Sequence, residues 1–379
     1  MVQTIVSAVL PDDYHRCVRC AKWLGTREKL EAHLTAVHSM TLEEYCGKHR
    51  KSIERSIGIV KGKNPTKEGF AQDSDVPKTP RSPGVKSRQK PKKITPFFPV
   101  RRSLDDAVVE YVPKVDPYFI VDKGLTADVV FALDNEMVLY MWGPKGTCKT
   151  HTLMQMAALS RIPVIRLNCR ADMRSSHFIG RIAGRQGSTF WKDGVLPKAM
   201  KYGAWLLVDE VDIAPPHILN VLQAVMDSRV LTIEDTGGVV RAHKNFRIIF
   251  DANTSGAGDP SGQYHGTHPL NESFRDRVGM WVKTSHPTES FIKNLVTRKF
   301  PALPEEEVAR VAQLASKVNA GSSTVSEQLS VSIRRVLAMA MYLDSGYSWR
   351  RTLEFAIYNN VADKYELRAF KEVVKSIGL

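Results

Sequence analysis

A glycine-containing loop carries the residues whose types and spacing most clearly indicate chemistry. It follows the apolar run 137–142 and leads into the helical stretch 151–159, so the pattern predicts a strand, a loop and a helix. In such a loop, backbone N–H groups and the helix N-terminus surround phosphates. Lys149 would reach the β- and γ-phosphates of ATP, and the Thr150 hydroxyl would hold Mg²⁺. The predicted nucleotide-binding residues are Gly143, Pro144, Lys145, Gly146, Thr147, Cys148, Lys149 and Thr150.

One position departs from the pattern G-x-x-x-x-G-K-(S/T), because Cys148 stands where the pattern has glycine. Cysteine is small, so the loop can still close, but a left-handed backbone costs more there than with glycine. Taken alone, the segment is also compatible with an ordinary strand–turn–helix, and the rest of the chain has to decide between the two.

Two acids end an apolar strand about sixty residues after the loop, in Leu206-Leu207-Val208-Asp209-Glu210. Ligands of open α/β sheets bind at the carboxyl ends of the strands. Asp209 would contact Mg²⁺, directly or through water, and Glu210 would orient and deprotonate the attacking water. The alternative is a solvated acidic strand end before a helix that begins at Pro215-Pro216.

A third strand, 246–250, ends in Asp251-Ala252-Asn253-Thr254. Asn253 could position the same water beside the γ-phosphate, although alone it would be an ordinary turn former. Further along, an arginine within Phe274-Arg275-Asp276-Arg277-Val278 could reach the ATP of a neighbouring subunit and stabilise transition-state charge. The order of the sequence does not separate that role from a surface salt bridge.

The N-terminal region contains a C-x2-C-x12-H-x4-H spacing, formed by Cys17, Cys20, His33 and His38. Two cysteines on a knuckle and two histidines about one helical turn apart can converge on one tetrahedral Zn²⁺. Metal binding would then supply the folding energy of a segment too short for its own apolar core. Cys46 and His49, which follow closely, are treated as incidental.

This region resembles the single zinc fingers of bacterial and phage regulators of the Ros/MucR kind, including the tail from His38 to Tyr45. The resemblance implies DNA binding as one role of the finger, and many such fingers bind proteins instead. Both stay open.

The bulk composition sets wider limits. The chain has 379 residues, is 43% hydrophobic and carries a net charge of +14 with a pI near 9.5. No apolar run is long enough for a membrane span, and the N-terminus lacks a signal pattern. Five cysteines with one close pair indicate metal ligation in a reducing compartment, so we expect no membrane and a cytoplasmic location. Most of the excess charge lies between about residues 50 and 102.

Four regions follow from these patterns. We expect a zinc finger over 10–50 and a disordered basic Pro/Lys-rich linker over 51–103, either a tether or a salt-sensitive phosphate-binding arm. Apolar strands alternate with helices over 104–285, which predicts an α/β core with a parallel sheet flanked by helices. Helical periodicity alone follows over 286–379, which predicts an all-helical lid domain.

The motifs together, over about residues 115–340, resemble an AAA+ ATPase of the MoxR branch, and within it the CobS-type subunit of cobaltochelatase. Besides the loop and the Asp-Glu strand, the segments that carry the resemblance are 178–181, 190–197, 252–259, 263–267, 270–272 and 276–278.

By this resemblance, Asn253 corresponds to the sensor 1 residue and Arg277 to the arginine finger, with Arg275 as the alternative. Arg334 in Ser332-Ile333-Arg334 corresponds to sensor 2, the in-cis contact to the γ-phosphate, with Arg335 as the alternative. The family usually has Ser-Pro-Arg there. MoxR relatives often carry alanine at the position of Cys148.

The resemblance implies a hexameric ring that remodels a partner, often a protein with a von Willebrand A domain. The finger and the basic linker are additions that cobalt insertion does not require. The sequence therefore favours a Mg-ATP-hydrolysing ring motor that the finger targets to a protein or complex. The alternatives are a motor loaded on DNA or RNA, a true cobaltochelatase subunit, and a zinc-finger regulator whose ATPase domain is a nucleotide-gated assembly switch.

Overall fold

The computed structural model describes Leu34 and residues 94–185, 187–259, 264, 266–321 and 330–379. The predicted zinc ligands Cys17, Cys20, His33 and His38, and the basic linker as far as residue 93, lie outside the described residues. The zinc site, the linker and the bounds of the four regions stay predictions.

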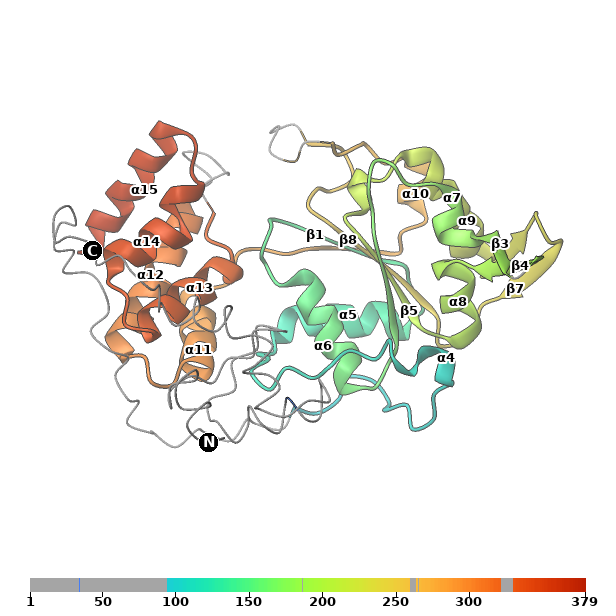
Figure 1. Cartoon of the computed structure of the whole chain (residues 1–379), viewed down its shortest axis with the longest axis horizontal. Helices are drawn as coiled ribbons and strands as arrows, with labels where there is room; N and C mark the ends of the chain where they lie inside the picture. The colour runs from blue at the N-terminus through green and yellow to red at the C-terminus, as the bar shows by residue number, and fades with distance from the viewer. Residues whose placement is uncertain (1–33, 35–93, 186, 260–263, 265, 322–329) are drawn as a thin grey trace, which may run out of the picture. The chain divides into compact units, whose positions relative to one another are not determined.

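A five-stranded parallel sheet, formed by strands between Leu139 and Lys283, lies at the centre of the described chain before the C-terminal helices (Figure 1). Its strands are rich in Val, Ile, Leu and aromatic residues, as expected for strands buried on both faces. Their spatial order is β2-β5-β8-β1-β9, so the sequential order is interrupted by crossovers. The strands are β1 (Leu139–Trp142), β2 (Val164–Asn168), β5 (Trp205–Asp209), β8 (Arg247–Ala252) and β9 (Met280–Lys283). The prediction of a parallel α/β sheet is confirmed.

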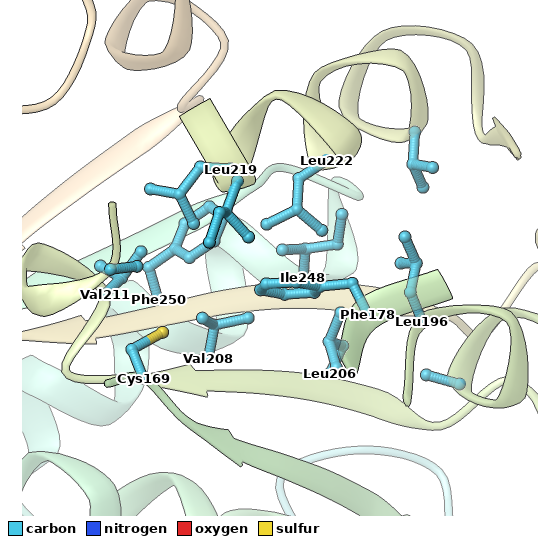
Figure 2. Close-up of a cluster of buried hydrophobic side chains, with 14 of the residues drawn as sticks. Cys169, Phe178, Leu196, Leu206, Val208, Val211, Leu219, Leu222, Ile248 and Phe250 are labelled. Atoms are coloured by element: carbon cyan, nitrogen blue, oxygen red, sulfur yellow. The ribbon is translucent and has the colours of Figure 1, made fainter. Parts of the chain in front are cut away.

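Helices cover both faces of this sheet. Successive side chains of each strand point to opposite sides, so both faces carry apolar side chains that pack against helices. On β5, Leu206 and Val208 join a buried cluster with α7 (Ser175–Ile179), α8 (Val195–Tyr202), α9 (Pro216–Ser228) and α10 (Glu272–Asp276), and Figure 2 shows this cluster. Trp205 and Leu207 join the opposite cluster with α5 (Lys123–Asp134) and α6 (Lys149–Leu159). The short α4 (Asp106–Val109) precedes α5.

Two antiparallel hairpins are inserted between the elements of the core. They are β3 (Gly180–Arg185) with β4 (Ser188–Asp193), and β6 (Val230–Ile233) with β7 (Gly238–Arg241). Both expose large apolar side chains: Ile182 and Phe190 on the first and Val239 on the second, with relative exposures of 61%, 46% and 56%. The register pairs Ile182 with Trp191 and Ala183 with Phe190, so Ile182 and Phe190 point to opposite faces of the first hairpin.

The described chain after β9 is helical, with its own buried core. Among the described helices of this region, α12 (Glu305–Gly321) is the longest, and it buries Val308, Val311, Ala312, Ala315 and Val318, which repeat at helical spacing. Side-chain oxygens cap several of these helices at their N-termini. The elements are α11 (Glu289–Lys299), α12 (Glu305–Gly321), α13 (Ile333–Asp344), α14 (Trp349–Ala356), η2 (Tyr358–Asn360) and α15 (Lys364–Ser376). The helical C-terminal region is confirmed within the described residues.

Candidate active site

The glycine-containing loop lies between β1 and α6, at the carboxyl edge of the sheet. Gly143 and Gly146 have φ of +145° and +78°, which L-residues rarely adopt. A Cβ on Gly143 would stand 2.4 Å from the carbonyl oxygen of Thr284, and one on Gly146 would stand 2.2 Å from Cβ of Ser332. Glycine is therefore needed for two close approaches, one of them to the N-terminus of α13.

Cys148 adopts the left-handed conformation that the loop demands, with φ +66° and ψ +17°. It is the N-cap of α6, and no side chain caps the first turn of that helix. The N–H groups of that turn are oriented as an anion site requires. Burial raises the pKa of the Cys148 thiol, and the side chain packs against the core of the C-terminal helices.

The strain at Cys148 gives a stability prediction. A residue with a Cβ in the left-handed conformation costs about 1–2 kcal/mol relative to glycine. Cys148→Gly removes this cost, but the variant also loses the packing of the half-buried thiol, and this loss offsets the gain in stability. We expect Cys148→Gly to lie within about 0.5 kcal/mol of the wild type and Cys148→Val to lose about 1–2 kcal/mol, since β-branched residues tolerate positive φ least. Urea denaturation measures both, and a Val variant as stable as the Gly variant would contradict the conformational argument.

Lys149 lies under the loop with 7% of its surface exposed. Its Nζ donates to the carbonyl oxygens of Gly143 at 2.8 Å and Pro144 at 3.1 Å. The nearest carboxylate oxygen is Asp251 Oδ1, at 3.9 Å. Burial lowers the pKa of Lys149, and the neighbouring acids oppose that shift.

Three acids end neighbouring strands beside the loop. Asp209 on β5 accepts from the Arg166 guanidinium, through Nε at 2.9 Å and through Nη2. Asp251 Oδ2 on β8 accepts a hydrogen bond from the Thr150 hydroxyl. Burial raises the pKa of Asp251 to about 6. Glu210 follows Asp209 in the left-handed conformation, with φ +55°, and its side chain is exposed in the cleft.

The tip that carries Asn253 is held by Asp212, which is fully buried in the short η1 helix (Val211–Ile213). Asp212 Oδ2 accepts from Asn253 N at 3.1 Å, Thr254 N at 2.9 Å and Thr254 Oγ1 at 2.9 Å. Its carbonyl oxygen accepts from His268 N at 2.7 Å. Asp212 thus ties the segment after Glu210 to the tip of β8.

A cleft of about 840 Å³ opens along this edge of the sheet, which is within the range of small-molecule sites. Its walls include the loop, Asp209, Glu210, Asp251 and Asn253. Residues 116–128 and 282–288, together with parts of α11 and α13, complete the lining. The cleft gathers, from segments far apart in the sequence, the cis residues predicted for nucleotide chemistry.

One of the four candidate arginines lines the cleft, and the other three lie outside it. Arg334 lines the cleft, on the first turn of α13, whereas Arg335 lines a smaller hollow among the C-terminal helices. Arg277 is not among the lining residues, and its Nε bonds Asp227 Oδ2 at 2.7 Å on the surface. Arg275 lies over the Trp281 ring, 5.7 Å from its centroid.

Sequence reasoning missed several residues of the cleft. Asp116 Oδ1 accepts a hydrogen bond from Tyr118 N. Asp116 Oδ2 lies 3.5 Å from His151 Nε2 and 3.7 Å from Lys299 Nζ. No local motif marks it. Asp251, by contrast, ends an apolar strand as Asp209 does, so the same rule could have found it.

The donors beside the loop suit Mg²⁺, which takes oxygen ligands and is commonly bound by one or two carboxylates together with substrate phosphates. The Thr150 hydroxyl and the carboxylates of Asp209 and Asp251 supply such oxygens. In the part of the chain that the structure describes, no group of three or more His, Cys, Asp or Glu side chains forms a metal cage. None of the described helices is long and apolar enough to cross a membrane.

Comparison with known proteins shows which family the chain is similar to. Residues 138–278 match the model of the AAA domain of the dynein-related subfamily. The chain is 30% identical over 230 residues to the aerobic cobaltochelatase subunit CobS of a Sinorhizobium species, covering 57% of this chain and 69% of that protein. It is 27% identical over 254 residues to protein NorQ of Paracoccus denitrificans, covering 66% and 90% of the two chains. It is also 27% identical over 270 residues to the uncharacterized protein YojN of Bacillus subtilis, covering 69% and 84%. The chain belongs to the AAA+ family of the MoxR type, and it is an ATPase.

Proposed function

We propose that the protein is a subunit of a ring, hexameric by the family resemblance, that uses Mg-ATP hydrolysis to remodel a partner protein or complex. The observation that carries the ATP part is the cleft that joins the loop, the acidic strand ends, Asn253 and Arg334. In this proposal, Zn²⁺ held by Cys17, Cys20, His33 and His38 folds the N-terminal finger, which directs the ring to its partner.

Within one subunit the residues divide the work on ATP. The loop N–H groups and Lys149 bind the phosphates, and Thr150 with a strand-end carboxylate holds Mg²⁺. Mg²⁺ neutralises charge on the β- and γ-phosphates when bound. Glu210 takes the proton of the attacking water, Asn253 orients that water, and Arg334 contacts the γ-phosphate from α13. The close approach of Ser332 to Gly146 supports this role for the start of α13.

Arg277 acts between subunits in this proposal. Its place outside the cleft of its own chain, on the surface beside Asp227, supports a role at the ATP of a neighbour. An arginine in that position stabilises transition-state charge without being needed for ATP binding.

A mixing experiment tests the trans role. We expect Arg277→Ala to bind ATP normally and to lose about 10³-fold in hydrolysis rate. Lys149→Ala should not bind ATP but retains Arg277, so mixing the two inactive variants should restore hydrolysis in mixed rings. Steady-state ATPase assays across mixing ratios measure this. Arg275→Ala is the matched control, and a mixture no more active than its parts would contradict the trans assignment.

The two hairpins support a protein partner. Ile182, Phe190 and Val239 expose apolar surface on them, and aromatic side chains such as Phe190 are enriched at protein interfaces over the surface average. The similarity to a protein named as a subunit of cobaltochelatase also supports work within a complex. A protein with a von Willebrand A domain is the partner that the family resemblance suggests.

The deciding experiment captures the partner on a tagged Glu210→Gln variant, which should bind ATP and hydrolyse it slowly. The variant is expressed in the native host and isolated with ATP and Mg²⁺, and protein and nucleic acid are both identified. A stoichiometric protein that is absent with Lys149→Ala supports remodelling. Nuclease-sensitive nucleic acid without a protein would replace the proposal by a motor loaded on DNA or RNA, and ATPase stimulation that collapses with salt would accompany it.

The assembly-switch reading makes a different prediction. A switch needs ATP binding but not hydrolysis, so Glu210→Gln would keep cellular function while Lys149→Ala abolished it. Equal loss in both variants, measured by complementation of a deletion, favours the motor.

A further inference from the structure

The stretch of chain around Asp116 is fixed to α6, the helix that follows the phosphate-binding loop. Gln155 on α6 is only 5% exposed. Its Oε1 accepts from Asp116 N at 2.7 Å, and its Nε2 donates to the carbonyl oxygen of Lys114 at 3.1 Å. Losing either bond would leave a buried polar group unsatisfied, which is costly. The backbone at Asp116 therefore keeps a fixed position relative to Lys149 and Thr150, which lie in the first turn of the same helix.

The same stretch also meets the C-terminal helices. Tyr118, Phe119 and Ile120 line the cleft, and Ile120 packs against the buried core of those helices. Arg298, near the end of α11, donates from Nη1 to the carbonyl oxygen of Phe119 at 3.4 Å. The next residue, Lys299, has its Nζ 5.8 Å from the centroid of the Tyr118 ring. This part of the cleft wall is thus in contact with both α6 and α11.

Asp116 carries the negative charge at this junction. Its Oδ1 accepts from Tyr118 N at 2.9 Å, and its Oδ2 faces His151 and Lys299. Burial lowers the pKa of His151 below its usual value of 6.5, so at neutral pH the compensating charge comes from Lys299. The side chains of Asp116 and Lys299 are 19% and 27% exposed, and salt screens a partly buried pair less than an exposed one.

Two other connections join the sheet to the C-terminal helices beside the cleft. One is the covalent connection 284–288 between β9 and α11. The other is a backbone bond from Ile333 N, at the start of α13, to the carbonyl oxygen of Gly146 at 3.4 Å. Among the residues that the structure describes, the ion pair that joins the two parts is the one between Asp116 and Lys299. Both parts line the cleft, so a bound nucleotide is released more easily when they move apart.

We propose that Asp116, through its ion pair with Lys299, holds the C-terminal helices closed over the nucleotide and slows nucleotide release. Asp116 is then a positioning residue, because it acts through Lys299 and not on the reacting phosphates. In many enzymes lid opening and product release, and not the chemical step, limit turnover. The inference rests on the proposed ATP role of the cleft and does not depend on which partner the ring remodels.

The test is a double-mutant cycle of Asp116→Asn and Lys299→Met in the full chain. Asparagine retains the Oδ1 that accepts from Tyr118 N, so Asp116→Asn removes the charge and little else. Stopped-flow displacement of a fluorescent ADP analogue measures release, and single-turnover hydrolysis of ATP measures the chemical step. We expect each single variant to release the analogue about two- to fivefold faster, the size of a partly exposed ion pair. The double variant should release it no faster than either single variant, and hydrolysis should stay within about twofold of the wild type.

Lys293→Met is the matched control, because it removes an ion pair with Glu289 that lies within α11 and does not reach the sheet. It should release the analogue at the wild-type rate. Release at the wild-type rate in Asp116→Asn and Lys299→Met, effects that add in the double variant, or an equal acceleration in Lys293→Met would each overturn the proposal. If Asp116→Asn does not fold, as judged by circular dichroism, the comparison of Lys299→Met with Lys293→Met decides. A wild-type chain that binds no nucleotide would instead contradict the proposed ATP role of the cleft.

Discussion

Glu210→Gln should bind Mg-ATP with wild-type affinity and hydrolyse it about 10²–10⁴-fold more slowly, the range for loss of a general base. Glutamine has nearly the shape of glutamate but cannot accept the proton of the attacking water. The side chain is exposed in the cleft and lies at the end of β5, so its exchange leaves the core intact. Release of phosphate under single-turnover conditions, with ATP affinity measured separately, gives both quantities.

A surface exchange of the same chemistry provides the control. Glu234 is exposed in the turn between β6 and β7, and Glu234→Gln should hydrolyse ATP at the wild-type rate. Loss of ATP binding in Glu210→Gln, or a rate within a few-fold of the wild type, would contradict the assignment of Glu210 as the base.

The backbone at Glu210 adds a reason to expect a functional residue there. Its left-handed φ of +55° is unusual for a residue with a Cβ, and such strain costs about 1–3 kcal/mol and is concentrated at active sites. Cys148 has the same conformation at the other side of the cleft. The loop therefore keeps its shape with Cys148 in place of glycine, and the backbone of Cys148 is strained as a result.

The local parts of this site could be predicted from the sequence, because their elements are contiguous. A strand, a glycine loop and a helix need only neighbouring residues, and so does an apolar strand that ends in Asp209 and Glu210. The alternation of strands and helices also predicted the parallel sheet and the helical C-terminal region correctly.

The parts that the sequence could not supply depend on strand order and long-range contact. Nothing in the order of the chain indicates that β8 lies between β5 and β1, and this order is what brings Asp251 to Thr150. The bond that joins Asp212 to the tip at Asn253 spans 41 residues. Asp212 follows Glu210 by two positions and reads from the sequence as one more solvated acid.

Asp212 gives the second large effect. Asp212→Ala would leave the N–H groups of Asn253 and Thr254 and the Thr254 hydroxyl without their acceptor. An unsatisfied buried donor costs about 1–3 kcal/mol, and relief from burying the carboxylate offsets part of that, so we expect a loss of about 3 kcal/mol in the free energy of unfolding. Urea denaturation measures it, with the exposed turn variant Asp235→Ala as control.

Asp212→Asn separates stability from positioning. Asparagine retains one acceptor oxygen but carries no charge. The tip of β8 should therefore stay folded, while the hydrogen bond that residue 212 accepts from Asn253 N weakens. Because Asp212 does not line the cleft, ATP affinity should hold while the hydrolysis rate falls, by about tenfold for each 1.4 kcal/mol of lost transition-state stabilisation. An Asp212→Ala chain as stable as the wild type, or an Asp212→Asn chain whose affinity and rate fall together, would show that Asp212 does not act by holding Asn253 in place.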